Sequence, residues 1–189
     1  RITTLADAIE VDWNTIEAAT FANPTPIPLN VSKASDALTY PAAGNLATLS
    51  DYSIYLECST NGILGSSASQ TGIGGSADYQ PYIDFSPVDA VKFYSDGVGS
   101  TGASGTLLDT SKTAVNKVAV SKVTGSRLLS ISVNGGTVGT ATASATQNAE
   151  TTIIRIGNGA VGGSLYGSVR NLRIYPTALS AAKLQSMTA

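Results

Sequence analysis

Residues 128–136 read Leu-Leu-Ser-Ile-Ser-Val-Asn-Gly-Gly, and this stretch carries the strongest folding signal in the chain. Apolar side chains alternate with serines up to position 133, which is the period-two pattern of a strand with one buried face. The pair Asn134-Gly135 favours positive φ at both central positions, as a type I′ turn requires. We therefore expect a hairpin in which residues 128–133 fold back against 137–143, with Ile131 pointing inward.

Short alternating segments continue on both sides of this hairpin. They predict strands at residues 52–58, 83–85, 90–94, 118–121, 151–156 and 169–175. The Gly- and Ser-rich stretches 65–76 and 96–105 are expected to be loops between strands. The segment Ser180–Met187 predicts a short helix with Ser180 as its N-cap and Leu184 on its inner side.

This succession of short strands and turns predicts an all-β fold, an antiparallel jelly-roll β-sandwich with a short C-terminal helix. We expect residues 1–189 to form a single domain, with an irregular N-terminal segment, 1–30, packed on it. That segment contains Pro24, Pro26 and Pro28, which force the chain into an extended conformation.

Two strand patterns predict where particular side chains point. Cys58 is in phase with the apolar residues of its strand, so we expect a free, buried and unreactive thiol. Arg170 and Arg173 lie three apart in the last strand, which predicts that they point to opposite faces. We expect one arginine to pair with a neighbouring carboxylate and the other to be solvated.

The composition excludes several classes of function. The 189 residues carry 11 Lys and Arg against 13 Asp and Glu, so the chain has no basic footprint for nucleic acid. The absence of His excludes histidine triads and imidazole metal sites, and a lone Cys excludes an intrachain disulfide. The sequence contains no run of about 18 apolar residues, so we predict no membrane span. Because the chain opens with Arg1, we interpret it as a piece of a longer protein.

The last third of the chain contains a series of motifs in a characteristic order. After the Val133-Asn134-Gly135 hairpin come Ile156-Gly157, then 169–175 with the sequence Val-Arg-Asn-Leu-Arg-Ile-Tyr, and then Ala178-Leu179-Ser180. This order resembles the concanavalin A-like, laminin-G-type jelly roll over about residues 115–185. The resemblance implies a β-sandwich with a helix that starts at the Ala-Leu-Ser motif.

Motifs near both ends of the chain resemble one particular group of jelly-roll modules. Trp13-Asn14 and the segment 179–188 are similar to the ends of jelly-roll modules in tailed-phage and prophage virion proteins. That resemblance implies a non-enzymatic module of a tail fibre, tail tip or capsid surface, located on the virion, and a homo-oligomer such as the trimers common among virion appendages. Such a module binds a host-surface glycan or attaches to other virion proteins. The alternative is a secreted or cell-surface bacterial carbohydrate-binding or adhesion module.

Glycoside hydrolase activity is the less favoured interpretation of the sequence. Laminarinase-like relatives of this superfamily carry Glu-x-Asp-x-x-Glu on one strand, and Glu10-Val11-Asp12 begins a similar pattern here. Thr15 stands where the final Glu is needed, so we interpret the segment as a solvated acidic edge and predict no enzymatic activity. We interpret Trp13 as an anchor that docks the N-terminal segment on a sheet.

Sugar binding needs an aromatic ring for the apolar face of the sugar and polar groups for its hydroxyls. The stretch with Asp78, Tyr79, Gln80 and Tyr82 supplies both kinds, with Pro81 to stiffen it. A second candidate sugar-binding site, with fewer suitable side chains, combines Asn158 with Tyr166. The competing interpretation for each tyrosine is that it packs on the rim of the sandwich.

Calcium is the one cofactor that the pattern leaves open, and we otherwise expect none. The candidates for its ligands are Asp78, Asp84, Asp89 and Asp96, which lie near predicted loops and strand ends. They do not form a compact run of ligands. The alternative is that these aspartates stabilise turns by bonding to their own backbone.

Overall fold

The computed structural model describes residues 38–60, 70–75, 81–86, 90–95, 103–106, 114–144, 149–158, 163–165 and 167–189. The chain divides into two units, residues 1–34 and 35–189, and every described residue belongs to the second. The expectation of a single domain over the whole chain therefore stays a prediction. Trp13 and the acidic segment that begins at Glu10 lie outside the described residues.

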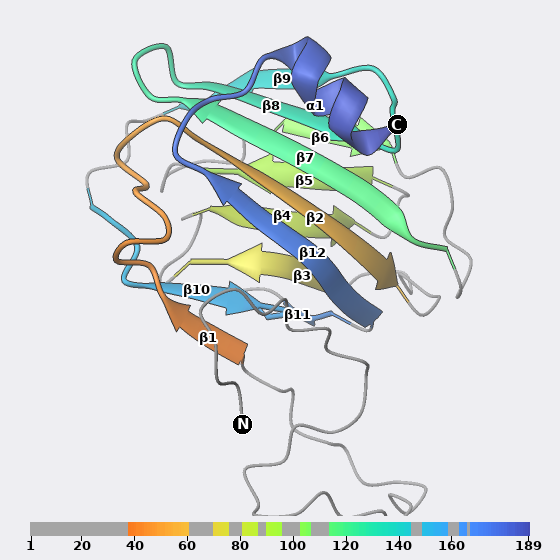
Figure 1. Cartoon of the computed structure of the whole chain (residues 1–189), viewed down its shortest axis with the longest axis horizontal. Coiled ribbons are helices and arrows are strands. Elements are labelled where there is room, and N and C mark those ends of the chain that lie inside the picture. Colours follow the sequence, from red (N-terminus) through yellow and green to blue (C-terminus); the bar gives the residue numbers. More distant parts are fainter. Residues whose placement is uncertain are drawn as a thin grey trace, which may run out of the picture. The chain divides into compact units, whose positions relative to one another are not determined.

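The second unit is a two-layer β-sandwich with one helix, as the sequence predicts (Figure 1). A seven-stranded sheet has the order β1-β10-β3-β4-β5-β6, with β11 paired to β3. Its strands are β1 (Leu38–Pro41), β3 (Gln70–Gly74), β4 (Tyr82–Ser86), β5 (Ala90–Tyr94), β6 (Ala103–Thr106), β10 (Ile153–Ile156) and β11 (Gly163–Ser164). All of its pairs are antiparallel except the one between β11 and β3.

The second sheet has five strands in the order β12-β2-β7-β8-β9, all antiparallel. They are β2 (Tyr52–Thr60), β7 (Asn116–Val123), β8 (Leu128–Val133), β9 (Gly139–Thr142) and β12 (Gly167–Tyr175). Helix α1 (Ala181–Thr188) lies on the outside of this sheet, over β7 and β8 (Figure 1). None of the described helices is long and apolar enough to cross a membrane.

The predicted hairpin is present. Asn134 and Gly135 have φ values of 49° and 73°, and the Gly136 N–H donates to the Val133 carbonyl at 2.8 Å. This is the i-to-i+3 bond of the expected type I′ turn. Ladder pairing between β8 and β9 then begins at Ile131 opposite Gly139. Ile131 is fully buried, so the predicted register is confirmed.

Strand β2 is buried on both faces, whereas its sequence shows only one apolar face. Tyr52, Ile54, Leu56 and Cys58 point into the core between the sheets, and Cys58 is a free, buried cysteine. Burial raises the pKa of this thiol, as expected for an inert cysteine. On the opposite face Tyr55 joins a small cluster with Ala119 and Leu184, which lies on α1 as predicted.

Both stretches that we expected to be loops contain strands. β3 lies within 65–76, and most of β6 lies within 96–105. The glycines that suggested loops are required by close packing instead. A Cβ on Gly72 would stand 2.6 Å from a ring carbon of Phe85, and one on Gly105 would stand 2.7 Å from a methyl of Val133. Glycine within a strand often marks a bulge or a site of close approach.

The two arginines of β12 do not point to opposite faces, which corrects the sequence-based expectation. Arg170 pairs with Glu57 of β2 and Arg173 with Tyr55, and the register shifts between the two arginines. Asn171 adopts a positive φ of 50° at this bulge. The extra residue of a bulge restores a common face to two side chains that lie three apart.

The sandwich closes at one edge where β6 meets β9. A Cβ on Gly139 would stand 1.9 Å from the carbonyl oxygen of Ser104, a backbone atom that cannot rotate away. The two sheets therefore approach at this edge more closely than any side chain permits. Glycine at position 139 is a steric requirement of the closed edge.

A polar cluster fixes the segment between β1 and β2 at the far end of the sandwich. The Glu150 carboxylate accepts hydrogen bonds from Thr48 N–H, from the Thr48 hydroxyl and, at 2.9 Å, from Leu49 N–H. Lys122 is 1% exposed, and its ammonium donates to the Thr48 carbonyl at 2.8 Å. It also lies 5.8 Å from the centroid of the Tyr52 ring. These contacts satisfy a buried charge that the sequence pattern does not predict.

Ile131→Ala should destabilise the domain by about 2–5 kcal/mol, because it removes buried apolar atoms and leaves a cavity between the sheets. Leu128→Ala is the matched control on the same strand, since Leu128 is 36% exposed. Its effect should stay within about 0.5 kcal/mol. Urea unfolding measures both, and equal losses would show that the two side chains share one environment.

Gly139→Ala should destabilise the domain by about 1–3 kcal/mol or prevent folding, because the new methyl meets the Ser104 backbone. Gly125→Ala is the control, since nothing lies within 4 Å of a Cβ at that position. Thermal unfolding monitored by circular dichroism should separate the two variants. Similar melting temperatures would contradict the closed edge between β6 and β9.

Glu150→Gln should lower the melting temperature at neutral pH, since an amide nitrogen would then replace one of the two oxygens that accept from Thr48 and Leu49. Burial raises the pKa of Glu150, but hydrogen bonds from Thr48 and Leu49 and the charge of Lys122 more than offset this effect. The pKa of the folded state therefore lies below the ordinary 4.5. The stabilisation is complete above the pKa of the unfolded chain and is lost as pH falls through the folded-state pKa.

The difference in unfolding free energy between wild type and Glu150→Gln should therefore shrink between about pH 7 and about pH 3.5. Urea titrations at the two pH values measure this. A difference that is unchanged by pH would contradict the assigned role of the Glu150 charge.

Candidate functional site

The outer face of the seven-stranded sheet carries a group of polar and aromatic side chains. Along β4 and β5, the fully buried Ile83, Phe85, Val91 and Phe93 point to the core. Because successive residues of a strand alternate between faces, the residues between them point outward. We call the resulting set the Tyr82 face: Thr71, Tyr82, Asp84, Lys92, Tyr94 and Arg155.

Two tyrosines form the aromatic part of the Tyr82 face. Tyr82 and Tyr94 are directly opposite each other on neighbouring strands, and their ring centroids are 5.9 Å apart at a tilt of 51°. The Thr71 hydroxyl donates to the Tyr82 hydroxyl at 3.0 Å. Both tyrosines are half-buried, so the cross-strand pair holds two partly exposed rings side by side.

Arg155 lies on the other side of β3 from the tyrosines. It is paired with Gly74, which follows Ile73, and Ile73 is paired with Ile83, the residue after Tyr82. Gly74 places no side chain between the arginine and the ring. The Arg155 Nε donates to the Gly75 carbonyl at 3.2 Å, which orients the guanidinium along the strand.

A second row crosses the same face. Thr71 pairs with Asp84, which pairs with Lys92. Thr71 and Asp84 are buried, whereas Lys92 is half-buried. The Tyr82 face therefore combines two rings with hydrogen-bond donors and a carboxylate acceptor, the set that carbohydrate recognition uses.

Of the residues predicted for sugar binding, Tyr82 lies on this face. Asn158 follows Gly157, whose N–H donates to the Gly72 carbonyl at 2.9 Å, so Asn158 comes next to β3 as well. The rest of the predicted set lies outside the described residues, namely Asp78, Tyr79, Gln80 and Tyr166. The sequence analysis missed Lys92, Tyr94 and Arg155, although strict alternation in 90–94 was the signal that could have found the first two.

The predicted calcium ligands do not gather in the described part of the chain. Asp84 is in the middle of β4 rather than at a strand end, and it is 5% exposed. Asp78, Asp89 and Asp96 lie outside the described residues. Among the described residues there is no group of three His, Cys, Asp or Glu side chains that could hold a metal ion.

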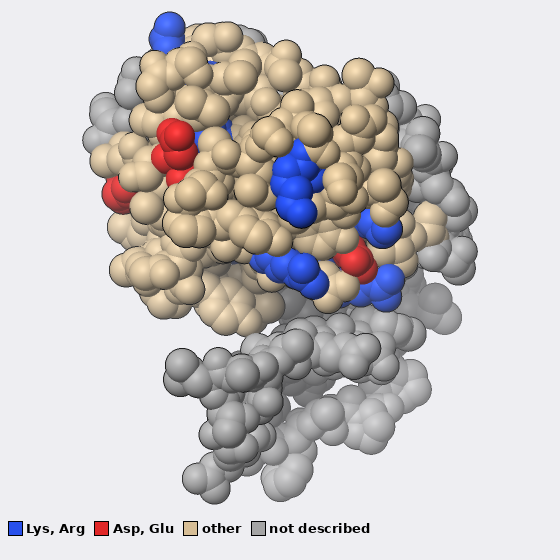
Figure 2. Space-filling model, turned by 45° about the horizontal axis from the view of Figure 1, so that its top comes forward, with Lys and Arg blue, Asp and Glu red and all other residues tan. Residues whose placement is uncertain are grey.

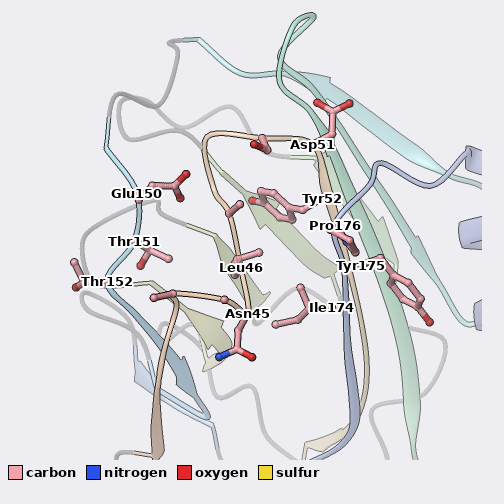
Figure 3. A pocket seen from close by; sticks show the side chains of 14 residues that line it. Asn45, Leu46, Asp51, Tyr52, Glu150, Thr151, Thr152, Ile174, Tyr175 and Pro176 are labelled. Atoms are coloured by element: carbon pink, nitrogen blue, oxygen red, sulfur yellow. The ribbon is translucent and has the colours of Figure 1, made fainter.

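A hollow of about 670 Å³ opens at the end of the sandwich where Glu150 fixes the β1–β2 segment. Figure 3 shows Leu46 and Ile174 facing each other across it, while the Tyr175 ring points away. Its carboxylates already serve the fold, because Glu150 binds Thr48 and Leu49 and one Asp51 oxygen accepts from Thr124 N–H at 2.7 Å. The hollow is therefore a poorer candidate for ligand binding than the Tyr82 face.

Charge is sparse on the face of the molecule that Figure 2 shows. Blue and red side chains stand in small separate groups on a largely neutral surface. This distribution is unlike the continuous basic surface with which proteins neutralise a nucleic-acid backbone. It agrees with the low charge of the sequence.

No protein-family model and no curated protein matches this chain. Solved structures do match its fold. The CBM40 module of the Ruminococcus gnavus IT-sialidase, bound to α2,3-sialyllactose, superposes with a TM-score of 0.57 at 15% identity, over 84% of this chain and 96% of that one. The binding domain of botulinum neurotoxin DC, in complex with SialylT, gives a TM-score of 0.57 at 12% identity, over 74% and 35%.

The Trypanosoma rangeli sialidase gives a TM-score of 0.58 at 10% identity, and the match covers 80% of this chain but 25% of that enzyme. The present chain thus corresponds to about a quarter of the sialidase and to nearly the whole CBM40 module. At these identities the similarity concerns the fold. The described unit is an all-β sandwich that shares its fold with these structures.

Proposed function

We propose that this domain binds glycans, without acting on them, through the Tyr82 face. The observation that carries the proposal is the pair of half-buried rings, Tyr82 and Tyr94, 5.9 Å apart and flanked by Arg155 and Lys92. The fold supports it, because structures similar to this one include modules bound to sialyllactose.

The groups on this face have complementary tasks in such a complex. The rings of Tyr82 and Tyr94 pack against the C–H face of a sugar, while Arg155 and Lys92 donate hydrogen bonds to its hydroxyl or carboxylate oxygens. The Thr71 contact and the strand pairing fix the rings before the sugar arrives. Little conformational entropy is then lost on binding.

The number of carboxyl groups on the Tyr82 face favours binding without hydrolysis. A glycosidase that uses the usual retaining mechanism, with a carboxylate as its nucleophile, needs two carboxyl groups about 5–5.5 Å apart. Among the described residues of the Tyr82 face, Asp84 supplies one carboxylate and no second accompanies it. The proposed activity is therefore recognition.

For the biological setting we propose a virion appendage, such as a tail fibre, tail tip or capsid-surface protein that contacts host glycans. The support is the resemblance of the segment 179–188 and of Trp13-Asn14 to phage modules. The alternative is a secreted or cell-surface bacterial adhesion module. Mass spectrometry of purified particles and of the culture supernatant distinguishes the two, and crosslinking tests the proposed trimer.

Tyr94→Ala should weaken glycan binding at least tenfold, about 1.4 kcal/mol, because it removes one of the two stacking rings. An array of neutral and acidic oligosaccharides, including lactose and both sialyllactoses, identifies the glycan for calorimetric titration. Tyr94→Phe is the matched control, since it keeps the ring and should retain most of the affinity.

Thermal melting of each variant shows whether its fold is intact. A folded Tyr94→Ala protein that binds as tightly as wild type would exclude the Tyr82 face as the glycan site. Wild-type protein that binds nothing on the array would contradict the proposed function itself.

A further inference from the structure

The bulge of β12 creates a second cluster of aromatic and charged side chains, on the sheet opposite to the Tyr82 face. By aligning Arg170 with Glu57 and Arg173 with Tyr55, it places both arginines on one face of the five-stranded sheet. A regular strand would have separated them. The positive φ of Asn171 is the conformational cost of this arrangement.

Each guanidinium is held by a neighbour on β2. The Arg170 Nε donates to Glu57 at 3.0 Å, and the Tyr55 hydroxyl donates to the other Glu57 oxygen at 2.9 Å. The Arg173 guanidinium carbon lies 5.9 Å from the centroid of the Tyr55 ring, within the range of a cation–π contact. Glu57 and Tyr55 thus orient two arginine side chains whose own stems are long and flexible.

The carboxylate at the base of the cluster is ionised and recessed. The Glu57 side chain is 15% exposed, against 58% for Arg170. Burial raises the pKa of Glu57, but hydrogen bonds from Asn171, Tyr55 and Arg170 and the charge of Arg170 more than offset this, so its pKa is lowered. Burial and the bond to Glu57 raise the pKa of Tyr55 to about 12, so it stays a donor.

The arginines keep donors available at the surface. Among the described residues, the Arg173 guanidinium donates no hydrogen bond, and Arg170 uses only its Nε. Two guanidinium groups against one carboxylate leave a net positive charge at the bulge. Planar guanidinium groups with parallel N–H bonds match the oxygens of a carboxylate or a sulfate.

We propose that Arg170 and Arg173 form a second binding site, which takes a carboxylate or sulfate group carried by an acidic glycan. A membrane surface or a nucleic acid fits less well, because such polyanions are bound by many cations and this chain has a net charge of −2. The site is independent of the Tyr82 face, which lies on the outer side of the other sheet.

The test uses two acidic probes, a sulfated heparin tetrasaccharide and a hyaluronan tetrasaccharide that carries only carboxylates. Wild-type protein should bind at least one of them in calorimetry, and Arg173→Gln should weaken that binding at least tenfold. Arg173→Lys should also weaken it, because an ammonium keeps the charge but lacks the paired donors. Binding of neither probe by the folded wild-type protein would overturn the proposal.

Lys183→Gln is the matched control, since it removes one exposed positive charge from α1, on the same side of the molecule. It should change the affinity less than twofold. A loss equal to that of Arg173→Gln would mean nonspecific attraction and would contradict a defined site. Inorganic sulfate should not displace the tetrasaccharide at equal concentration, and displacement would assign the site to a free anion instead.

To show that the two sites are separate, each variant is also tested with the ligand proposed for the other site. Arg173→Gln should weaken binding of the acidic tetrasaccharide far more than Tyr94→Ala does, and it should leave binding of a neutral glycan at the Tyr82 face unchanged. If Tyr94→Ala abolishes acidic binding while Arg173→Gln has no effect, the acidic glycan binds at the Tyr82 face and the second site is excluded.

Discussion

The close approach of the two sheets is the constraint on which the rest of this structure depends. At the edge formed by β6 and β9, a side chain at position 139 would collide with the Ser104 backbone. Gly105 plays the same part farther inside, beneath Val133 of the facing sheet, whereas Gly72 makes room for the Phe85 ring on the neighbouring strand β4 of its own sheet. Such tight packing lets a core of modest side chains bury its apolar surface without voids, which suits a sequence with few large aromatic residues.

The packing also decides which surfaces remain for function. Helix α1 covers part of the outer face of the five-stranded sheet, where Leu184 packs on Tyr55 and Ala119. It also touches the hairpin turn, since the Gly135 N–H donates to the Thr188 hydroxyl at 3.0 Å. Among the described elements, α1 is the only one outside the two sheets. The strands of the Tyr82 face and the exposed end of β12 are therefore the surfaces on which ligands can be bound by side chains held on rigid strands.

Charges that bond within the fold and charges with unused donors have different tasks in this domain. Lys122 and Glu150 hold the segment between β1 and β2, and their partners are backbone and hydroxyl groups of that segment. Arg170 and Arg173 are held from below by Glu57 and Tyr55 while their remaining donors face outward. A charge whose bonds are all inside the fold contributes to stability, whereas an oriented charge with unused donors is suited to binding.

The sequence by itself determined the local structure. Alternation predicted the strands around Ile131 and Cys58, the Asn134-Gly135 pair predicted its turn, and Ser180 predicted the start of the helix, because each depends on neighbours in the chain. Tertiary structure decided the rest. It made strands of the glycine-rich stretches near Gly72 and Gly105, because their conformation depends on the neighbouring strand at Gly72 and on the facing sheet at Gly105. It brought Tyr94 beside Tyr82 and placed Arg155 opposite Gly74 on the same face of the sheet, and it turned Arg173 to the side of Arg170, because strand register and a bulge arise only when strands pair.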